Sequence, residues 1–230
     1  MAHVPLSPEV ENVAKIDPPI SPWDSRYPDL LTCPIVYQKE TNNSRQDRLY
    51  TNLMVKSIYF GAGCFWCSEA VFTRLRGIVS VQSGYAGGTT ANPTYWDVVA
   101  KKTGHVEVVR VKYDSQIIKL AELLSVFFAT HDPTTPNRQG YDIGTQYRSA
   151  IYYQHSDDKK VIENYIANLT KDQIFKNPIV TEVREVKDFY PAEADHYRYY
   201  DMNKSSAYCT VIIDPKLAKL RQSFAHLLKK

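Results

Sequence analysis

Two thiols and two large aromatic side chains stand together in the run Cys64-Phe65-Trp66-Cys67, directly after a glycine turn at residues 61–63. The residues before the turn, 54–60, are apolar and rich in β-branched and aromatic types, which is typical of a strand. Residues 68–76 have the apolar spacing of a helix. Cys64 is therefore expected at a strand-to-helix junction, where backbone N–H groups and the helix dipole favour the reactive thiolate. The alternative is a buried structural cysteine among core aromatics.

A carboxyl group follows on a second strand, predicted at residues 105–113 by their alternation of side chains. Glu107 shares the apolar face of that strand with Val109, Val111 and Tyr113. The other face carries Val108, Arg110 and Lys112, and its charges predict that it is solvated. Burial raises the pKa of a carboxyl group, so we expect Glu107 to be protonated and able to donate a proton. The alternative is that Glu107 lies near the strand end and reaches water.

The elements that must position these groups alternate along the chain. Further strands are expected at residues 78–85, 147–154 and 179–186, helices at 117–129, 157–170 and 215–229, and a glycine-rich loop at 85–93. This order predicts an α+β fold: a mixed β-sheet with packed helices, in a two-layer sandwich with a ferredoxin-like core. Long irregular N- and C-terminal segments are expected to flank it.

Composition narrows the class of protein. With 230 residues, of which 43% are hydrophobic, the chain can bury one substantial core. Its 28 basic and 25 acidic residues are spread along the chain, so we expect no nucleic-acid partner. The four cysteines are too few for a secreted disulfide scaffold, which indicates a reducing compartment with working thiols. No segment reaches the roughly 18 apolar residues of a membrane span, so we expect a cytoplasmic protein without a membrane partner.

Residues 1–50 differ from the rest, because seven of the 13 prolines fall by Pro34. We predict a proline-rich N-terminal extension at 1–50 and one catalytic domain at 51–230. The extension is either a disordered tail or an arm that packs on the domain through Trp23, Tyr27, Leu30 and Leu31.

A set of ordered motifs resembles one family. The motifs are Gly63-Cys64-Phe65-Trp66, Gly84-Tyr85-Ala86-Gly87-Gly88, Pro93-Thr94-Tyr95, Gly104-His105-Val106-Glu107, His131-Asp132-Pro133, Gly144-Thr145-Gln146-Tyr147-Arg148-Ser149, Phe189-Tyr190-Pro191-Ala192-Glu193 with His196, and Tyr208-Cys209. In this order they are similar to the A-type peptide methionine sulfoxide reductases, from about Tyr59 to Pro215. The resemblance implies reduction of the S epimer of methionine sulfoxide, peptide-bound or free, with thioredoxin as the electron donor and without a cofactor. We expect a monomer.

The resemblance also assigns roles to residues. Cys64 is the nucleophile that becomes a sulfenic acid, and Glu107 is the proton donor. Phe65 and Trp66 hold the substrate methyl group. The remaining positions are the hydroxyls of Tyr95 and Tyr147 around the sulfoxide oxygen, Asp142 as an orienting polar group, and, from a less regular spacing, Tyr199 and Tyr208 near the site.

Two thiols are candidates to resolve the sulfenic acid. Cys209 is similar in context to the resolving cysteine of the family, and we expect it to react first from a flexible C-terminal segment. Cys67 is the alternative, because a helix that begins at once places Cys64 and Cys67 on one face, as in paired-cysteine redox proteins. Cys33 has no counterpart in the family and is expected to be a bystander.

Three other interpretations are weighed against this one. A metal site built on His105, His131 and His196 lacks a second paired cluster to complete four ligands, so we assign no metal. A general thiol–disulfide oxidoreductase would explain the Cys64–Cys67 pair, but the surrounding thioredoxin-like pattern is missing. A redox-sensing interaction module would use Cys209 and the proline-rich extension. The last two leave Glu107, Tyr95 and Tyr147 without a function.

Overall fold

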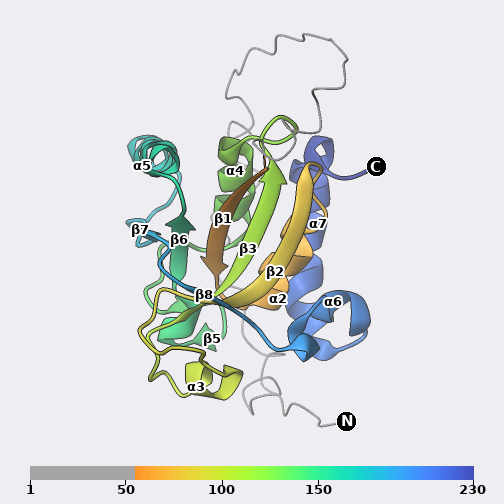
Figure 1. Cartoon of the computed structure of the whole chain (residues 1–230). Helices are drawn as coiled ribbons and strands as arrows, with labels where there is room; N and C mark the ends of the chain where they lie inside the picture. Colours follow the sequence, from red (N-terminus) through yellow and green to blue (C-terminus); the bar gives the residue numbers. More distant parts are fainter. Residues whose placement is uncertain (1–54) are drawn as a thin grey trace, which may run out of the picture. The chain divides into compact units, whose positions relative to one another are not determined.

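The computed structural model describes residues 55–230 (Figure 1). The predicted extension at residues 1–50, the packing of its aromatic residues and the bystander Cys33 lie outside the described residues.

A six-stranded mixed sheet forms the centre of the described part (Figure 1). Its strand order is β7-β6-β1-β3-β2-β8, and β6 and β7 are its parallel pair of neighbours. The strands are β1 (Val55–Ala62), β2 (Ile78–Ala86), β3 (Val106–Asp114), β6 (Ser149–Tyr153), β7 (Glu182–Glu185) and β8 (Phe189–Pro191). Two short strands, β4 (Arg138–Gln139) and β5 (Asp142–Ile143), pair in a separate hairpin.

The four inner strands confirm the ferredoxin-like core. They lie in the order β6-β1-β3-β2, and helices α2 (Phe65–Phe72) and α4 (Leu120–Thr130) connect β1 to β2 and β3 towards β6. The other helices are α3 (Tyr95–Val99), α5 (Ser156–Lys171), α6 (Tyr199–Met202) and α7 (Asp214–Ser223). The predicted α+β class with a mixed sheet and packed helices is therefore confirmed.

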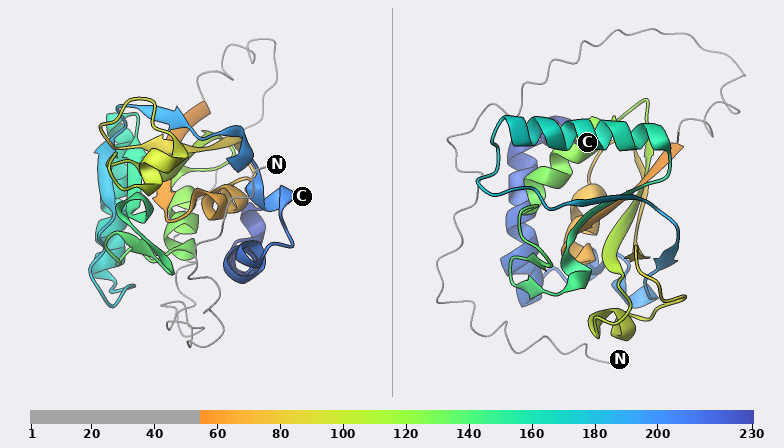
Figure 2. Two further views of the ribbon diagram at one scale, coloured as in Figure 1. Left: turned by 90° about the horizontal axis from the view of Figure 1, so that it is seen from below. Right: turned by 90° about the vertical axis from the view of Figure 1, so that its left-hand side faces the viewer.

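One face of the sheet packs against α2 and α4, and α7 packs on these two helices (Figure 2). Phe60 of β1 stacks on Phe72 of α2 and on Phe127 of α4, with both ring-centroid distances at 4.9 Å. Burial of a side chain of this size contributes about 1.5–3 kcal/mol to folding. This core fixes α2, which begins after Cys64, against β1 and against β3, which carries Glu107.

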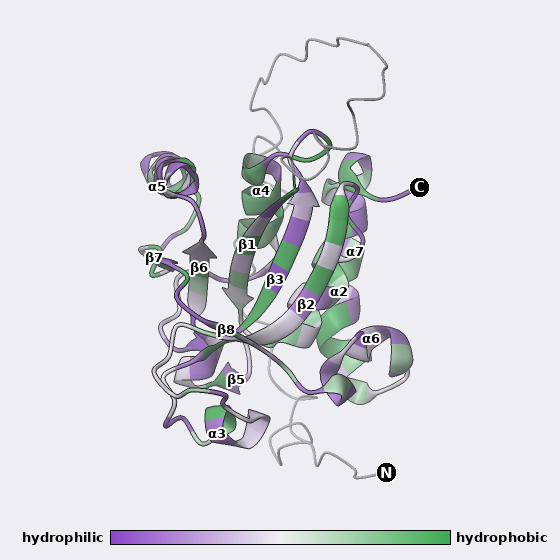
Figure 3. Ribbon diagram, viewed as in Figure 1, coloured by the Kyte–Doolittle hydropathy of each residue, from purple (hydrophilic) through white to green (hydrophobic). Residues whose placement is uncertain are grey.

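The opposite face holds a second, smaller core, so the prediction that this face of β3 is solvated is wrong. Val108 is fully buried there with Tyr59, Val106, Tyr152 and their neighbours. Phe189 and Val186 pack against this cluster, because the chain after β7 crosses the face to pair β8 with β2 (Figure 1). Arg110 and Lys112 are half-buried, and the alternating colours of β3 in Figure 3 mark the charged positions.

Several predicted helix boundaries shift. The helix expected at 68–76 begins at Phe65 and ends at Phe72, because Cys64 takes the N-cap position and the Thr73 hydroxyl donates back to the Glu69 carbonyl. The helix expected at 117–129 begins at Leu120. The terminal helix expected at 215–229 ends at Ser223, since the following chain turns back to pair near Leu75.

The C-terminal segment alternates irregular chain with short helices. Between α6 and α7 lies a π-helical stretch, Cys209–Ile213, that leads directly into α7. Cys209 is fully buried in this stretch. The expected flexible segment around Cys209 is thus helical and packed in this structure. Within residues 55–230, none of the helices has the length and apolar character needed to cross a bilayer.

Candidate active site

The structure places Cys64 at the predicted strand-to-helix junction. β1 ends at Ala62, Gly63 makes the turn with φ +83°, and Cys64 is the N-cap of α2. A side chain at position 63 would meet the Gln139 side chain at 2.6 Å, so the turn requires glycine for both its dihedral angle and its space. The junction therefore fixes the position of the thiol tightly.

Glu107 lies against the first residue of the same helix. Its Oε2 accepts a hydrogen bond of 3.1 Å from the backbone N–H of Phe65, and its side chain is buried with 2% of the residue exposed. Burial raises the pKa of Glu107 to about 8, while the Phe65 N–H acts in the opposite direction and the charge of Asp142 adds to the rise. The protonated state that strand alternation predicts for Glu107 agrees with this pKa.

The thiolate expected at Cys64 is not favoured in this structure. Burial raises the pKa of Cys64 well above its usual range, and the hydrogen bond with Cys67 and the charges of Glu107 and Asp142 raise it further. The same hydrogen bond lowers the pKa of Cys67. The effect of burial exceeds that of the helix N-terminus, so burial favours the thiol form of Cys64 in this structure.

Two of the predicted hydroxyls converge on this thiol and acid. Tyr95 is the first residue of α3, and Tyr147 ends a short 3-10 turn, Thr145–Tyr147. Burial raises the pKa of both tyrosines, and the charges of Glu107 and Cys64 raise it further in each case. Both hydroxyls therefore stay protonated at neutral pH and can donate hydrogen bonds to an oxygen held near Cys64.

Asp142 and Tyr208 form a second polar pair at the site. The Tyr208 hydroxyl donates to Asp142 Oδ2 at 3.1 Å and lies 3.8 Å from the Cys67 sulfur. Burial raises the pKa of Asp142, and the bond from Tyr208 partly offsets this effect. The β4–β5 hairpin, which the sequence pattern did not predict, is the element that brings Asp142 here.

Aromatic rings line the side of the site that faces the C-terminal segment. The ring of Trp66 stacks on Tyr199, with centroids 3.6 Å apart and an interplanar angle of 5°. Tyr208 meets Trp66 edge-on at 5.7 Å, and Phe65 lies tilted at 6.5 Å from it. The two tyrosines with the less regular spacing are thus both in contact with the predicted methyl-binding residue.

Two further residues of the site, Glu193 and His196, belong to a motif for which sequence reasoning assigned no catalytic or binding role. Trp66 Nε1 donates to His196 Nδ1 at 3.1 Å. Glu193 accepts hydrogen bonds from the Tyr95 N–H at 2.7 Å and from the Tyr85 hydroxyl at 2.9 Å. The signal that could have found them was the motif at residues 189–193 with His196.

The three histidines considered as metal ligands each form hydrogen bonds with a different set of protein groups. His131 is buried between the Phe127 carbonyl and the Ser149 hydroxyl. His105 contacts the Thr90 carbonyl and accepts a hydrogen bond from the Gly88 N–H. Both therefore have structural partners away from His196.

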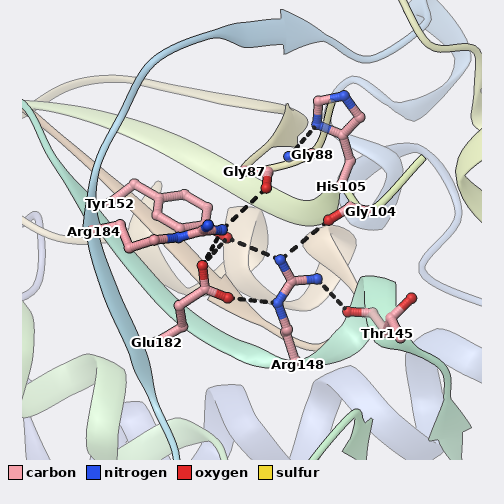
Figure 4. A network of polar contacts seen from close by, with 9 residues as sticks. All are labelled: Gly87, Gly88, Gly104, His105, Thr145, Arg148, Tyr152, Glu182 and Arg184. Atoms are coloured by element: carbon pink, nitrogen blue, oxygen red, sulfur yellow. Dashed lines mark hydrogen bonds and ion pairs between the residues drawn. The ribbon is translucent and has the colours of Figure 1, made fainter. Parts of the chain in front are cut away.

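A polar network supports the loops on which Tyr95 and Tyr147 lie (Figure 4). Arg148 pairs with Glu182 at 2.7 Å and donates to the carbonyls of Gly104 and Thr145. Arg184 also pairs with Glu182 and donates to the Gly87 carbonyl at 3.0 Å. The network thus ties β7 to both ends of the loop before β3 and to the 3-10 turn of Tyr147.

The three thiols within residues 55–230 are all reduced. Cys64 and Cys67 are hydrogen-bonded to each other. Cys209 interacts electrostatically with Cys67, and its backbone N–H donates to the Ser206 hydroxyl. Cys67 therefore interacts with both of the other thiols, with Cys64 through a hydrogen bond and with Cys209 electrostatically.

Comparisons with known proteins give one family. The family described as peptide methionine sulfoxide reductase matches residues 56–228. A Trichodesmium erythraeum protein named peptide methionine sulfoxide reductase MsrA is 49% identical over 171 residues, covering 74% of this chain and 97% of its own length. An Acinetobacter baumannii protein of the same name is 53% identical over 170 residues, covering 74% and 96%. The structure of reduced Mxr1 from Saccharomyces cerevisiae superimposes with a TM-score of 0.62 and 33% identity, covering 67% of this chain and 88% of that one.

Proposed function

Because this chain belongs to the peptide methionine sulfoxide reductase family and is therefore a thiol-dependent oxidoreductase, we propose that it reduces the S epimer of methionine sulfoxide, peptide-bound or free, through Cys64. The observation that carries this proposal is the contact between Glu107 and the Phe65 N–H, which holds a buried, protonated acid beside the N-cap thiol. We assign the catalytic domain to residues 51–230, with residues 1–50 as an extension to it.

The reductase step uses Cys64 and Glu107 as its reacting protein groups. The Cys64 sulfur forms a bond to the sulfoxide sulfur while Glu107 gives its proton to the sulfoxide oxygen. The S–O bond and the new S–S bond then break as the protonated oxygen passes to the Cys64 sulfur, which releases the thioether, and the thiol proton of Cys64 goes to Glu107. The sulfoxide is reduced to methionine, and Cys64 is oxidised to a sulfenic acid.

The remaining groups stabilise this step. The hydroxyls of Tyr95 and Tyr147 donate to the oxygen as negative charge develops on it. The rings of Phe65 and Trp66 receive the methyl group, and Asp142 orients the site with Tyr208. Because Tyr199 stacks on Trp66 in this structure, the face of Trp66 that it covers is open to the substrate methyl only after Tyr199 moves.

A disulfide follows the sulfenic acid. The contacts favour Cys67 as the first partner, because its sulfur is hydrogen-bonded to Cys64 and its pKa is lowered, whereas Cys209 has no contact of this kind with Cys64. Cys67 displaces water from the sulfenic acid to form a disulfide with Cys64. Cys209 then attacks the Cys67 sulfur and releases the Cys64 thiol, which leaves a Cys67–Cys209 disulfide that thioredoxin reduces. The resemblance of Cys209 to the family's resolving cysteine supports the other order, in which it reacts first.

The test is an assay of the purified chain on each epimer of a methionine sulfoxide peptide, with dithiothreitol or with thioredoxin. We expect efficient turnover of the S epimer with either reductant and only trace turnover of the R epimer. Reduction of insulin disulfides without sulfoxide turnover would instead support a thiol–disulfide oxidoreductase built on the Cys64–Cys67 pair. Working thiols of this kind suit a reducing compartment, so we propose that the protein is cytoplasmic. We also propose that it is a monomer.

A further inference from the structure

Glu193 lies outside the reacting groups but contacts residues on both sides of the site. It precedes a 3-10 turn, Ala194–His196, and its side chain is 45% exposed. One carboxylate oxygen accepts the Tyr95 N–H at 2.7 Å, which fixes the first residue of α3. The other accepts the hydroxyl of Tyr85, a fully buried residue whose ring packs on Phe65 at 5.8 Å.

His196 connects the same turn to the methyl-binding side. Its ring lies 4.7 Å from Tyr95, 5.1 Å from Phe65 and 5.7 Å from Trp66. Its Nδ1 accepts the indole N–H of Trp66, so a neutral ring carries its proton on Nε2, which faces Glu193 at 3.9 Å. Burial lowers the pKa of His196 and thereby favours this neutral form.

These contacts matter because the sulfur of a sulfoxide is pyramidal. Its two epimers differ only in which positions the oxygen and the methyl group occupy relative to the rest of the methionine. An enzyme separates them when the group that receives the oxygen and the group that receives the methyl keep a fixed placement. Here Tyr95 is on the first side, Phe65 and Trp66 are on the second, and residues 193–196 contact both.

We infer that Glu193, with His196, is a positioning residue that sets epimer selectivity by fixing Tyr95 relative to the rings of Phe65 and Trp66. This inference rests on the proposed function. Glu193 itself touches no reacting atom. A charge-assisted hydrogen bond to a backbone N–H suits this task, since it is short and directional.

The test compares Glu193→Ala with Glu193→Gln and with the matched control Asp195→Ala, using dithiothreitol as the reductant. Asp195 is exposed in the same turn. In Glu193→Ala we expect the ratio of kcat/KM for the S epimer to that for the R epimer to fall by about 10-fold or more, the scale of a lost hydrogen bond to a charged group. Glutamine still accepts the Tyr95 N–H, so Glu193→Gln should restore most of the ratio. Asp195→Ala should match the wild type.

Other outcomes overturn the inference. An unchanged selectivity ratio in Glu193→Ala, including one with a uniformly lower kcat, would show that Glu193 is only structural. An equal loss in the glutamine variant would show that charge and not geometry is decisive. If Glu193→Ala does not fold, Tyr85→Phe removes a single bond to the carboxylate and should lower the ratio by a smaller factor, and an unchanged ratio there contradicts the inference. Failure of the wild type to reduce either epimer would contradict the proposed function instead.

Discussion

The carboxyl group of Glu107 accepts a hydrogen bond from the backbone N–H of Phe65, the residue that follows Cys64 in the chain. This contact joins β3, one of the two central strands of the sheet, to the first turn of α2. It places a group that can donate a proton next to a group that can attack sulfur.

Replacement of Glu107 by glutamine tests the acid. Glutamine keeps the size of the side chain and an oxygen for the Phe65 N–H but cannot donate an acidic proton. We expect the single-turnover rate of sulfoxide reduction at pH 7 to fall by about 100-fold or more. An unchanged rate would remove Glu107 from the mechanism.

The single-turnover rate of sulfoxide reduction should also depend on pH. Because the pKa of Glu107 is raised to about 8, the acid is protonated below that pH and loses its proton above it. The wild-type single-turnover rate should therefore decrease as the pH rises above about 8. The Glu107→Gln variant should lack this decrease, and a wild-type rate that stays constant up to pH of about 10 would contradict the assignment.

The Tyr147 hydroxyl is expected to stabilise charge on the sulfoxide oxygen. Tyr147→Phe removes that donor without changing the ring, and we expect kcat to fall by about 100-fold with a smaller change in KM. Tyr197→Phe is the matched control, because Tyr197 is 62% exposed. Equal kinetics of the two variants would show that Tyr147 makes no contribution of this kind.

The turn before Cys64 should be sensitive to a single methyl group. Gly63→Ala introduces strain at φ +83° and a contact of 2.6 Å with Gln139, and we expect a loss of more than about 2 kcal/mol of unfolding free energy. Gly140→Ala is the control, because Gly140 has φ +59° but no atom within 4 Å of the added carbon. Urea denaturation should show a clearly larger loss for position 63, and equal losses would refute the steric argument.

The order of disulfide formation is open to peptide mapping after one turnover without reductant. With Cys67 as the first partner, Cys209→Ser should accumulate a bond between Cys64 and Cys67, and Cys67→Ser should slow disulfide formation. A dominant bond between Cys64 and Cys209 in the Cys67→Ser variant, formed at the wild-type rate, would establish Cys209 as the first partner.

Local patterns in the sequence predict the parts of the site that depend on one element. Alternation along β3 places Glu107 on the apolar face with Val109 and Val111, and its observed burial agrees with that placement. Alternation alone left open that Glu107 reaches water at the strand end. The glycine turn before Cys64 is likewise a local signal. The resemblance to the family adds the tyrosines and Asp142, which no periodicity would single out among 17 tyrosines and 25 acidic residues.

Other features depend on contacts between distant segments, and local patterns miss them. Val108 is buried because residues 186–189 cross its face, and α3 is held by Glu193 from nearly a hundred residues away. The raised pKa of Cys64 has the same origin, since the helix N-terminus is visible in the sequence but the burial of the thiol by the assembled site is not.

The most direct test of the proposed mechanism is to find which cysteine sulfur is oxidised after one turnover. The Cys67→Ser, Cys209→Ser double variant, mixed with the S epimer and a cyclic 1,3-diketone that traps sulfenic acids, should release about one methionine per chain and carry the trap on Cys64. Release of methionine with the trap on another residue, or no methionine at all from the folded variant, would contradict the assignment of Cys64 as the nucleophile.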